Sequence, residues 1–294
     1  MRVLNFGSMN LDYVYAVQEI VRPGETVKAM SRQICCGGKG LNQSIALARA
    51  GAEVWHAGTI GSDGKALLHA LEESGVNTSL IRQVEGPSSH TVIQVDSRGC
   101  NSILFYPGEE AGVTEDHLQQ ALSCFAPGDY LLLQNEIEGA GKIIVAAKKK
   151  GLKVVLNPSP INEELKACPL ELVDCFILNE IEGGELTGES EPNAVLHTLH
   201  QRFPHALLVL TLGSEGSLCM AKGEVHKQPA FPAKAVDTTG AGDTFTGYFL
   251  AGMIQGLSVP HALKRASKAA ALAVERPGAA PSIPYAEEVE EEKP

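Results

Sequence analysis

The segment Asp237-Thr-Thr-Gly-Ala-Gly-Asp-Thr-Phe245 places small residues and a carboxylate directly before an apolar, helix-like stretch over 245–254. Its Gly240-Ala-Gly242 core lets the backbone turn tightly and point successive N–H groups at one place, which is the geometry that binds an anion. Asp243 would then lie beside that anion. A carboxylate repels a bound phosphate unless it takes a proton from the group that attacks the phosphate. The segment predicts an anion site with a general base; a capped helix after a Gly-rich turn is the structural alternative.

Two common nucleotide motifs are excluded by the residues themselves. Gly38-Lys39 is not a Walker A loop, because Gln33 stands at the first glycine position and Gly40 follows the lysine. The run Gly240-Ala-Gly242 is not a dinucleotide fingerprint, because Phe245 occupies the third glycine position. A phosphate-binding loop of another kind is therefore expected.

Most of the chain alternates short apolar runs with helical segments, and these elements must position the chemistry. The apolar runs are Val3–Phe6, Val54–Ala57, Tyr130–Gln134, Val154–Leu156, Cys175–Leu178 and Leu207–Leu210, and the helical segments include Leu41–Ala50, Lys65–Ser74 and Ala140–Lys150. Runs that are apolar on both faces and separated by helices are typical of a buried parallel sheet. We therefore predict a three-layer α/β/α architecture with a mostly parallel central sheet and right-handed crossovers.

Two pairs of strand-like runs break this alternation, because no helix separates their members. Tyr13–Val17 is followed by Thr26–Cys36, and Thr91–Val95 is followed by Ser102–Tyr106 across the turn Asp96-Ser-Arg-Gly99. We expect a small antiparallel sheet built from about 13–36 and 89–106 that projects from the main body. Edge strands of the main sheet are the alternative.

Composition limits the classes of partner. The 294 residues are 44% hydrophobic and 20% charged, which is typical of a soluble globular chain, and residues 1–294 are interpreted as one domain with this small sheet. With 24 basic and 35 acidic residues, the net charge of -11 argues against nucleic acid but not against a small anion held by local amides. The run Glu287–Glu292 is interpreted as a solvated tail or helix end. No apolar run approaches about 18 residues, and the start lacks a signal-peptide pattern.

The seven cysteines do not form a framework that the sequence identifies. They are Cys35, Cys36, Cys100, Cys124, Cys168, Cys175 and Cys219. Because the number is odd and no Cys-x-x-Cys occurs, we expect neither a disulfide scaffold nor a zinc site. Reduced, mostly buried thiols and a cytoplasmic location are the predictions.

Two stretches, Gly37-Gly-Lys-Gly-Leu-Asn-Gln43 and Asp237–Phe245, carry a resemblance to a known family. Supporting stretches follow in the same order as in that family: Gly7-Ser-Met-Asn-Leu-Asp12, Pro23-Gly-Glu-Thr26, Leu156-Asn-Pro-Ser-Pro160, Leu178-Asn-Glu-Ile-Glu182, Thr211-Leu-Gly-Ser-Glu-Gly216 and Arg276-Pro-Gly-Ala-Ala-Pro-Ser282. The sequence resembles the PfkB-type, or ribokinase-like, carbohydrate kinases from Val3 to Tyr285. This resemblance implies transfer of the γ-phosphoryl group of ATP to the primary hydroxyl of a sugar.

The resemblance also implies roles for individual residues around the sugar. Asp243 would be the general base, and the amides of Gly240, Ala241 and Gly242 would form the anion hole. The sugar would be held, together with Asp243, by Asn10, Asp12, Gly38, Lys39, Asn42 and Glu136. A helix cap is the structural alternative for Asn42, and a turn residue is the alternative for Asp12. Of these residues, the set that faces ribose in the family is present as Asp12, Gly38, Asn42, Glu136 and Asp243. It favours D-ribose, with ribose 5-phosphate as the product.

The same resemblance implies which residues bind the nucleotide and the ions. ATP would lie along Asn179, Thr211, Gly213, Ser214, Gly216, Gly242 and Ser267. Glu182 would organise Mg²⁺ through water, since Mg²⁺ keeps several waters, and a first-turn helix acid is the alternative. A monovalent cation, usually K⁺, would take oxygens from Asp237, Thr239, Ala273, Arg276, Gly278 and Ser282. The small sheet would be a lid through which two subunits pair, covering its exposed strands.

The sequence departs from the family pattern at two places that are expected to lie near the sugar. His90 replaces a smaller residue, and Tyr106-Pro-Gly-Glu-Glu110 replaces a different loop. Another sugar, such as a fructose-like ketose or a sugar acid, or a nucleoside therefore stays open as the substrate. A non-catalytic sugar or nucleotide sensor on the same fold is a further alternative, although such a protein would be expected to have lost Asp243 or the glycine loop.

Overall fold

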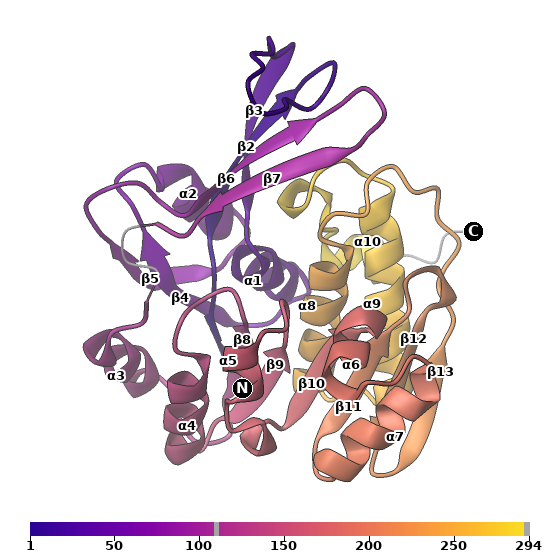
Figure 1. The fold of residues 1–294 in the computed structure, drawn as a ribbon. Coiled ribbons are helices and arrows are strands. Elements are labelled where there is room, and N and C mark those ends of the chain that lie inside the picture. Colours follow the sequence, from indigo (N-terminus) through magenta and orange to yellow (C-terminus); the bar gives the residue numbers. More distant parts are fainter. Residues whose placement is uncertain (109–111, 291–294) are drawn as a thin grey trace.

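The computed structural model describes residues 1–108 and 112–290, and it consists of a layered body with a small sheet projecting from it (Figure 1). Within these residues the central sheet has nine strands, in the order β13 (Glu224–Gln228), β12 (Ser217–Ala221), β11 (Leu207–Thr211), β10 (Cys175–Asn179), β9 (Lys153–Asn157), β8 (Tyr130–Gln134), β1 (Val3–Phe6), β4 (Val54–Ile60) and β5 (Asn77–Gln83). Pairing is parallel from β11 to β5, and the edge strands β12 and β13 are antiparallel. The predicted α/β/α fold is confirmed.

Helices cover both faces of this sheet. They are α1 (Lys39–Arg49), α2 (Lys65–Glu73), α3 (Glu115–Ser123), α4 (Ala140–Lys150), α5 (Glu163–Lys166), α6 (Glu180–Thr187), α7 (Pro192–Arg202), α8 (Ala241–Ile254), α9 (Val259–Val274) and α10 (Ala286–Glu290), with the 3-10 turns η1 (Leu170–Leu172), η2 (Gly213–Glu215) and η3 (Ala280–Ser282). Within residues 1–108 and 112–290, no helix is both long and apolar enough to cross a membrane.

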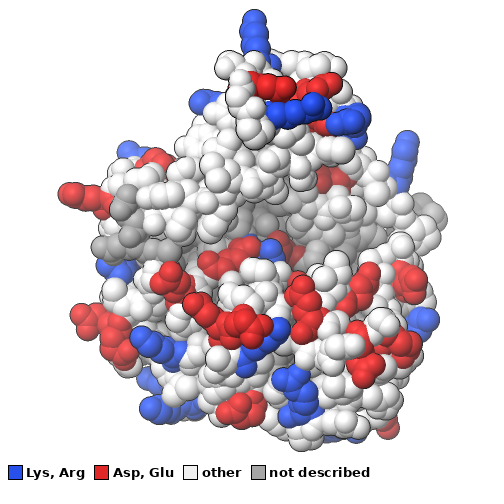
Figure 2. All heavy atoms as spheres, viewed as in Figure 1, with Lys and Arg blue, Asp and Glu red and all other residues white. Residues whose placement is uncertain are grey.

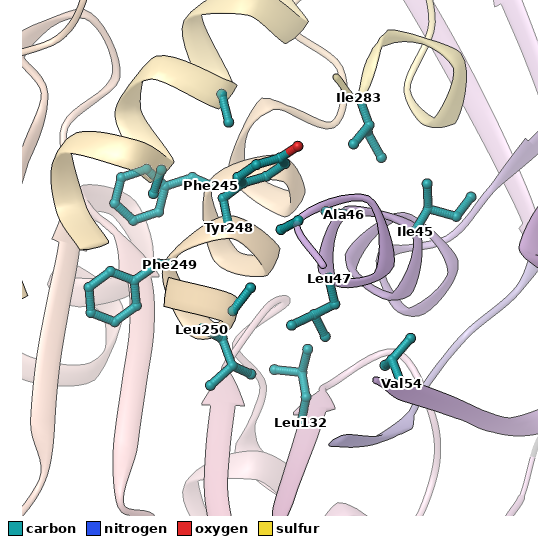
Figure 3. Packing of buried hydrophobic residues seen from close by; sticks show 14 of the residues in the cluster. Ile45, Ala46, Leu47, Val54, Leu132, Phe245, Tyr248, Phe249, Leu250 and Ile283 are labelled. Atoms are coloured by element: carbon teal, nitrogen blue, oxygen red, sulfur yellow. The ribbon is translucent and has the colours of Figure 1, made fainter. Parts of the chain in front are cut away.

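The hydrophobic core lies in two layers because successive strand residues point to opposite faces. On β8, Leu132 packs into the layer formed with α1, α2, α8 and α9, whereas Leu131 and Leu133 pack into the layer formed with α3, α4 and α7. Figure 3 shows the first layer, in which Leu132 lies below Leu47 of α1 and Leu250 of α8. This layer fixes α1 and α8 on the same face of the sheet.

Helices α1 and α8 approach each other closely at one glycine. A Cβ on Gly247 would meet the Cβ of Ala46 at 2.4 Å, so a larger residue there would push the helices apart. Because the helices cross here, the first turns of both point toward the same end of the sheet. The packing therefore brings Asn42 and Gln43 next to the start of α8.

The small sheet has the order β3 (Ser31–Gly37), β2 (Asn10–Ala16), β6 (His90–Val95) and β7 (Asn101–Tyr106), and it projects above the body in Figure 1. Both predicted antiparallel pairs are present, and parallel pairing of β2 with β6 joins them. The alternative of edge strands in the main sheet is therefore wrong. The segment Thr26–Met30 does not join β3, since only Met30 N–H donates back to Ala16 in β2.

Two expectations about the chain surface change. Only Cys175 and Cys219 of the seven free thiols are buried, whereas Cys35, Cys100 and Cys124 are exposed, because they lie on the projecting sheet, in its turn and at the end of α3. The prediction of mostly buried thiols was wrong. The acidic run near the C-terminus begins in α10, and its residues Glu291 and Glu292, like Glu109 and Glu110, lie outside the described residues.

Candidate active site

The site lies at β1, where the strand order of the sheet reverses. From β1 the chain continues to β4 and β5 on one side, and β8 to β11 follow on the other. In parallel sheets, the crevice at the carboxyl ends of two such neighbouring strands is where ligands bind. Ser8 follows β1 and Glu136 follows β8, and the Ser8 hydroxyl donates to Glu136 Oε2 over 2.5 Å. Figure 2 shows a hollow here, below the small sheet, with acidic side chains gathered along its lower side.

Glu136 is held by three donors. Besides Ser8, the Lys39 N–H donates to Oε2 and Lys39 Nζ donates to Oε1, each over 2.9 Å. Burial alone would lower the pKa of Lys39, but the charge of Glu136 and its hydrogen bond outweigh burial, and the pKa is raised. A fixed ammonium–carboxylate pair therefore lies where β8 ends and α1 begins. Ser8 was not predicted as a site residue, although it stands inside the quoted stretch Gly7–Asp12.

Asp243 lies in the first turn of α8, whose N-cap is Gly240. Asn42 Nδ2 donates to its Oδ2 and Gln43 Nε2 donates to its Oδ1, both over 2.9 Å. The N-cap of α1 is Gly38, so the capping alternative for Asn42 is wrong. The first N–H groups of α8 have no partner earlier in the helix, which makes this helix start an anion site beside the carboxylate.

The electrostatics of Asp243 suit a base. Burial raises its pKa from 3.8 to about 6, while the donors Gln43 and Asn42 and the charge of Lys39 oppose the rise. The nearby charge of Glu136 adds to the rise. At neutral pH the carboxylate is therefore ionised, yet it is far more basic than an exposed aspartate.

Asp12 lies inside β2, so the turn-residue alternative is wrong. The Thr91 hydroxyl donates to Asp12 Oδ1 over 2.6 Å, and a Cβ on Gly37 would stand 2.0 Å from Asp12 Oδ2. Glycine at position 37 therefore makes room for the carboxylate. Burial raises the pKa of Asp12, the Thr91 hydrogen bond lowers it, and the charge of Glu136 raises it, with a net increase. Thr91 was not predicted as a site residue.

Two acceptors near these carboxylates have no partner among the described residues. They are Asn10 Oδ1 and Asn42 Oδ1, and both residues are buried. A buried acceptor without a partner costs free energy, so such an atom in a site is suited to accept a bond from a ligand hydroxyl. The amide oxygens therefore favour a hydroxyl-rich ligand.

The sequence placed His90 near this pocket, and the sheet register contradicts that placement. Thr91 is paired with Asp12, whereas His90 is paired with Leu11, so the two side chains lie on opposite faces of the sheet. The His90 ring packs against Tyr13 and Tyr106, with centroids 5.7 and 5.0 Å away. Of the two neighbours, Thr91 faces Asp12 and His90 does not.

The residues expected at the nucleotide lie at the ends of neighbouring strands. Asn179 of β10 and Thr211 of β11 are register partners, Gly213 and Ser214 lie in η2, and Gly216 follows it. Ser267 is buried in α9. Glu182 forms a capping box with Asn179: its Oε2 accepts the Asn179 N–H and its Oε1 accepts Asn179 Nδ2, each over 3.0 Å. Glu182 thus has the position and the hydrogen bonds of an acid in the first turn of a helix, which is the structural alternative named for it.

The residues expected at a monovalent cation come from two adjoining loops. Asp237 Oδ1 accepts from Thr239 N and Oγ1 over 2.9 and 2.6 Å, and Oδ2 accepts from Gly278 N over 2.9 Å. Burial alone would raise the pKa of Asp237, but these donors outweigh it and the pKa is lowered. Ala273 lies in the last turn of α9, Arg276 follows two residues after its end, and Ser282 lies in η3. The Arg276 side chain forms an ion pair with Glu288, so only the backbone carbonyl of Arg276 would be offered to a cation.

Oxygen donors in this part of the chain fit the two ions differently. In the described residues no cluster of three or more His, Cys, Asp or Glu side chains could hold a metal. Mg²⁺ fits with water and phosphate as its main ligands, because Glu182 is the one carboxylate predicted for it and its oxygens also serve the capping box with Asn179. The Asp237 loop, which offers a carboxylate, a hydroxyl and backbone carbonyls, fits a hard cation.

A second hollow, of about 830 Å³, lies between α3, α4 and the segment 167–169. Its lining is largely apolar with Lys142, Lys149 and Lys150, and it contains none of the predicted site residues. The chemistry described above therefore belongs to the crevice below the small sheet.

Comparisons with known proteins agree with this geometry. The profile of the "pfkB family carbohydrate kinase" matches residues 2–286. Ribokinase of Haemophilus influenzae is 37% identical, over 96% of this chain and 95% of the relative, and deoxyribokinase of Salmonella typhi is 32% identical, over 99% and 98%. The structure of Arabidopsis thaliana ribokinase complexed with ribose and ATP superposes with a TM-score of 0.87 at 31% identity, covering 98% and 97% of the two chains. With its fold, its crevice and its signatures in agreement over almost the whole length, this chain belongs to the pfkB family of carbohydrate kinases.

Proposed function

We propose that the protein transfers the γ-phosphoryl group of ATP to the primary hydroxyl of D-ribose, giving ribose 5-phosphate. The observation that carries the proposal is Asp243, a carboxylate of raised pKa held by Asn42 and Gln43 at the start of α8. Similarity to ribokinases over the full length supports ribose as the substrate.

In this proposal Asp243 takes the proton of the attacking hydroxyl as the oxygen–phosphorus bond forms. The amides of Gly240, Ala241 and Gly242 stabilise the negative charge on the transferred group, since phosphoryl transfer depends mainly on positioning and charge stabilisation. The helix start adds its dipole to the same effect. The leaving group is ADP.

The sugar is proposed to lie between the small sheet and the crevice. Asp12 accepts bonds from two vicinal hydroxyls, and the free amide oxygens of Asn10 and Asn42 accept from others. Lys39 and Glu136, fixed to each other, bind the remaining oxygens from the opposite side. Gly38 contributes backbone at the start of α1.

A deoxy sugar is the second candidate substrate, favoured by one contact. Asp12 Oδ1 already accepts a bond from Thr91, which leaves fewer lone pairs for sugar hydroxyls. A substrate lacking one of the vicinal hydroxyls would lose little at such a carboxylate. The 32% identity to a deoxyribokinase supports the same alternative.

ATP is proposed to lie along Asn179, Thr211, the turn Gly213–Gly216 and Ser267. Mg²⁺ bound to ATP would neutralise phosphate charge, and Glu182 would contact it through water. The Asp237 loop would hold K⁺ through Asp237, Thr239, Ser282 and the backbone of Ala273, Arg276 and Gly278. A positive ion there would strengthen the anion site at the start of α8.

The small sheet is proposed to act as a lid and as a dimer contact. Its outer strand exposes large apolar side chains, with Leu104 70%, Ile103 58% and Phe105 50% accessible. Exposed apolar strands of this kind are suited to pairing with a second subunit. A cytoplasmic location is proposed because the exposed free thiols fit a reducing compartment.

An ADP-release assay tests the activity and the substrate together. The purified protein, MgATP and K⁺ would be combined with D-ribose, 2-deoxyribose, fructose and nucleosides in turn, and kcat/KM compared. We expect the highest kcat/KM for D-ribose. A higher value for 2-deoxyribose would establish the second candidate, and no ADP release with any acceptor would leave a sensor on this fold.

A further inference from the structure

Beneath Asp243 runs a chain of buried polar side chains that the proposed function does not use directly. Its members come from β1, α1, β4 and β8, and each is at most 1% exposed: Asn5, Gln43, Ser44, His56 and Gln134. These side chains hydrogen-bond one another, and Gln134 Oε1 is the one oxygen or nitrogen among their side-chain atoms without a partner in the described residues. The direction of each hydrogen bond in the chain therefore has consequences for the next.

The direction is fixed at the end remote from Asp243. His56 Nε2 lies 3.2 Å from the Gly7 carbonyl oxygen, which can only accept, so Nε2 carries the ring proton. Burial lowers the pKa of His56 to about 4, and the ring is neutral at physiological pH. Nδ1 is therefore an acceptor, and the Ser44 hydroxyl 2.8 Å away must donate to it.

The next links follow from that assignment. With its proton used, Ser44 Oγ accepts from Asn5 Nδ2 over 2.8 Å, and the same amide donates to the Gly40 carbonyl over 2.8 Å. Asn5 must then present its oxygen to Gln134, whose Nε2 donates to it over 3.1 Å. The same Nε2 donates to Gln43 Oε1 over 2.6 Å.

The orientation of the last amide is thus determined. Because Gln43 Oε1 accepts from Gln134, its Nε2 faces Asp243 Oδ1 and Asn157 Oδ1, each 2.9 Å away. Asn157 is oriented independently, since its Nδ2 donates to the Ile177 carbonyl over 2.9 Å. A flipped Gln43 would set its oxygen against the oxygens of Asp243 and Asn157, and its amide nitrogen against Gln134 Nε2, so all three hydrogen bonds would be lost.

We propose that Gln43 is a positioning residue for the base, and that the chain from Gly7 through His56, Ser44, Asn5 and Gln134 holds its amide so that it always donates to Asp243. This inference rests on the proposed role of Asp243. Asn42 holds one carboxylate oxygen and Gln43 the other, so the carboxylate has a single orientation toward the hydroxyl that it deprotonates.

The donor also tunes the acidity of the base. The charged groups that face Asp243 are Lys39 from α1, which favours ionisation, and Glu136 after β8, which opposes it. The amide chain itself carries no charge. Removing the Gln43 donor leaves these charges in place, so the pKa of Asp243 should rise and the acidic limb of the kcat profile should move to higher pH.

The test replaces Gln43 by methionine, which keeps the length of the side chain without its amide. We expect kcat with ribose to fall about 10- to 100-fold, as for loss of one charge-assisted hydrogen bond, and the acidic limb to rise by about one pH unit. KM values for sugar and ATP should change by less than about threefold, since the contact is to the base.

A remote variant keeps the test independent of folding at position 43. Ser44→Ala removes the hydroxyl that orients Asn5 and does not touch Asp243, and it should lower kcat in the same direction by about 3- to 10-fold. Ser74→Ala, which removes another buried hydroxyl at the end of α2, is the matched control and should leave kcat and its pH profile unchanged.

A readout without turnover separates this inference from the proposed function. The carboxyl of Asp243 would be titrated by carbon-13 NMR in the unliganded wild-type protein and both variants. A higher pKa in Gln43→Met and Ser44→Ala supports the inference, even if no sugar is phosphorylated. An unchanged titration and an unmoved acidic limb in a folded Gln43→Met protein would overturn it, and so would a Ser44→Ala protein that matches Ser74→Ala.

Discussion

Asn42 Nδ2 donates to Asp243 Oδ2 over 2.9 Å, although 201 positions of sequence separate the two residues. The contact exists because α1 and α8 cross at Ala46 and Gly247, one turn beyond these side chains. A residue proposed to bind sugar and the proposed base are therefore parts of one rigid unit. Changes at this helix crossing should alter catalysis as well as stability.

Replacing Asp243 by asparagine should stop turnover while leaving the fold. Loss of the base and of its charge should lower kcat by at least about 1,000-fold, whereas ATP binding, measured calorimetrically, should change little. Asp116→Asn, which alters an exposed first-turn acid of α3, is the control and should retain full activity. Unchanged turnover in Asp243→Asn would exclude this residue as the base.

The pH dependence of activity should follow the pKa of about 6 at Asp243. In the free enzyme, kcat/KM should be constant above pH 7 and fall about tenfold per unit below pH 6, because only the ionised carboxylate accepts a proton. Initial rates at low ribose concentration from pH 5 to 8 measure this. An acidic limb near pH 4 would contradict it.

Ionisation of Asp243 should lower the stability of the protein as pH rises, whereas it raises the activity. Folding raises the pKa of Asp243 from 3.8 to about 6, so between these values the folded state keeps a proton that the unfolded state has lost. The contribution of Asp243 to stability therefore falls as pH rises through this window. Thermal unfolding from pH 4 to 7 should show a steeper decline for wild type than for Asp243→Asn, and parallel curves would refute the assignment.

Thr91→Val should affect sugar binding more than catalysis. Valine keeps the shape but removes the hydroxyl that donates to Asp12, so Asp12 loses its orientation and its pKa rises further. We expect KM for ribose to increase about 5- to 10-fold with kcat within about twofold. Thr78→Val removes a similar hydroxyl–carboxylate bond on the exposed strand β5 and should change neither constant. Equal KM values in the two variants would remove Thr91 from the site.

Potassium should activate the enzyme through the Asp237 loop. At constant ionic strength, replacing K⁺ by choline should lower kcat severalfold, and Asp237→Asn should abolish the difference between the two buffers. Ribose phosphorylation rates in the two salts provide the measurement. Rates that are the same in K⁺, Na⁺ and choline would show that the loop has only a structural role.

Several parts of the site could be predicted from sequence because they are local. The Asp237–Asp243 segment carries its own turn and helix start, and β1 and β8 end where their apolar runs end. Which of the neighbours His90 and Thr91 faces Asp12 could not be predicted from sequence, because it depends on the register of β2 with β6. The edge strands β12 and β13 also escaped prediction because they leave the βα alternation.

The buried amide chain was beyond prediction for a similar reason. Gln134 ends an apolar strand, and a polar residue there is a visible signal, but its partners Asn5 and Gln43 lie 129 and 91 positions away. Glu182 shows the converse, since its sequence position was recognised while its carboxylate serves a capping box. Local patterns identify residues; only the packing assigns their partners.

The carboxylates in the crevice have a consequence for the release of product. Before transfer the sugar is neutral, and in the proposed function Asp12, Glu136 and Asp243 would bind it as hydrogen-bond acceptors, with Lys39 as the nearby cation. After transfer the sugar carries a phosphate of about −1.5 to −2 charge at pH 7, among three acids and one lysine. The reaction thus converts attraction into repulsion within the same crevice. We expect the phosphorylated sugar to bind more weakly than the sugar itself, so that the site empties after each turnover.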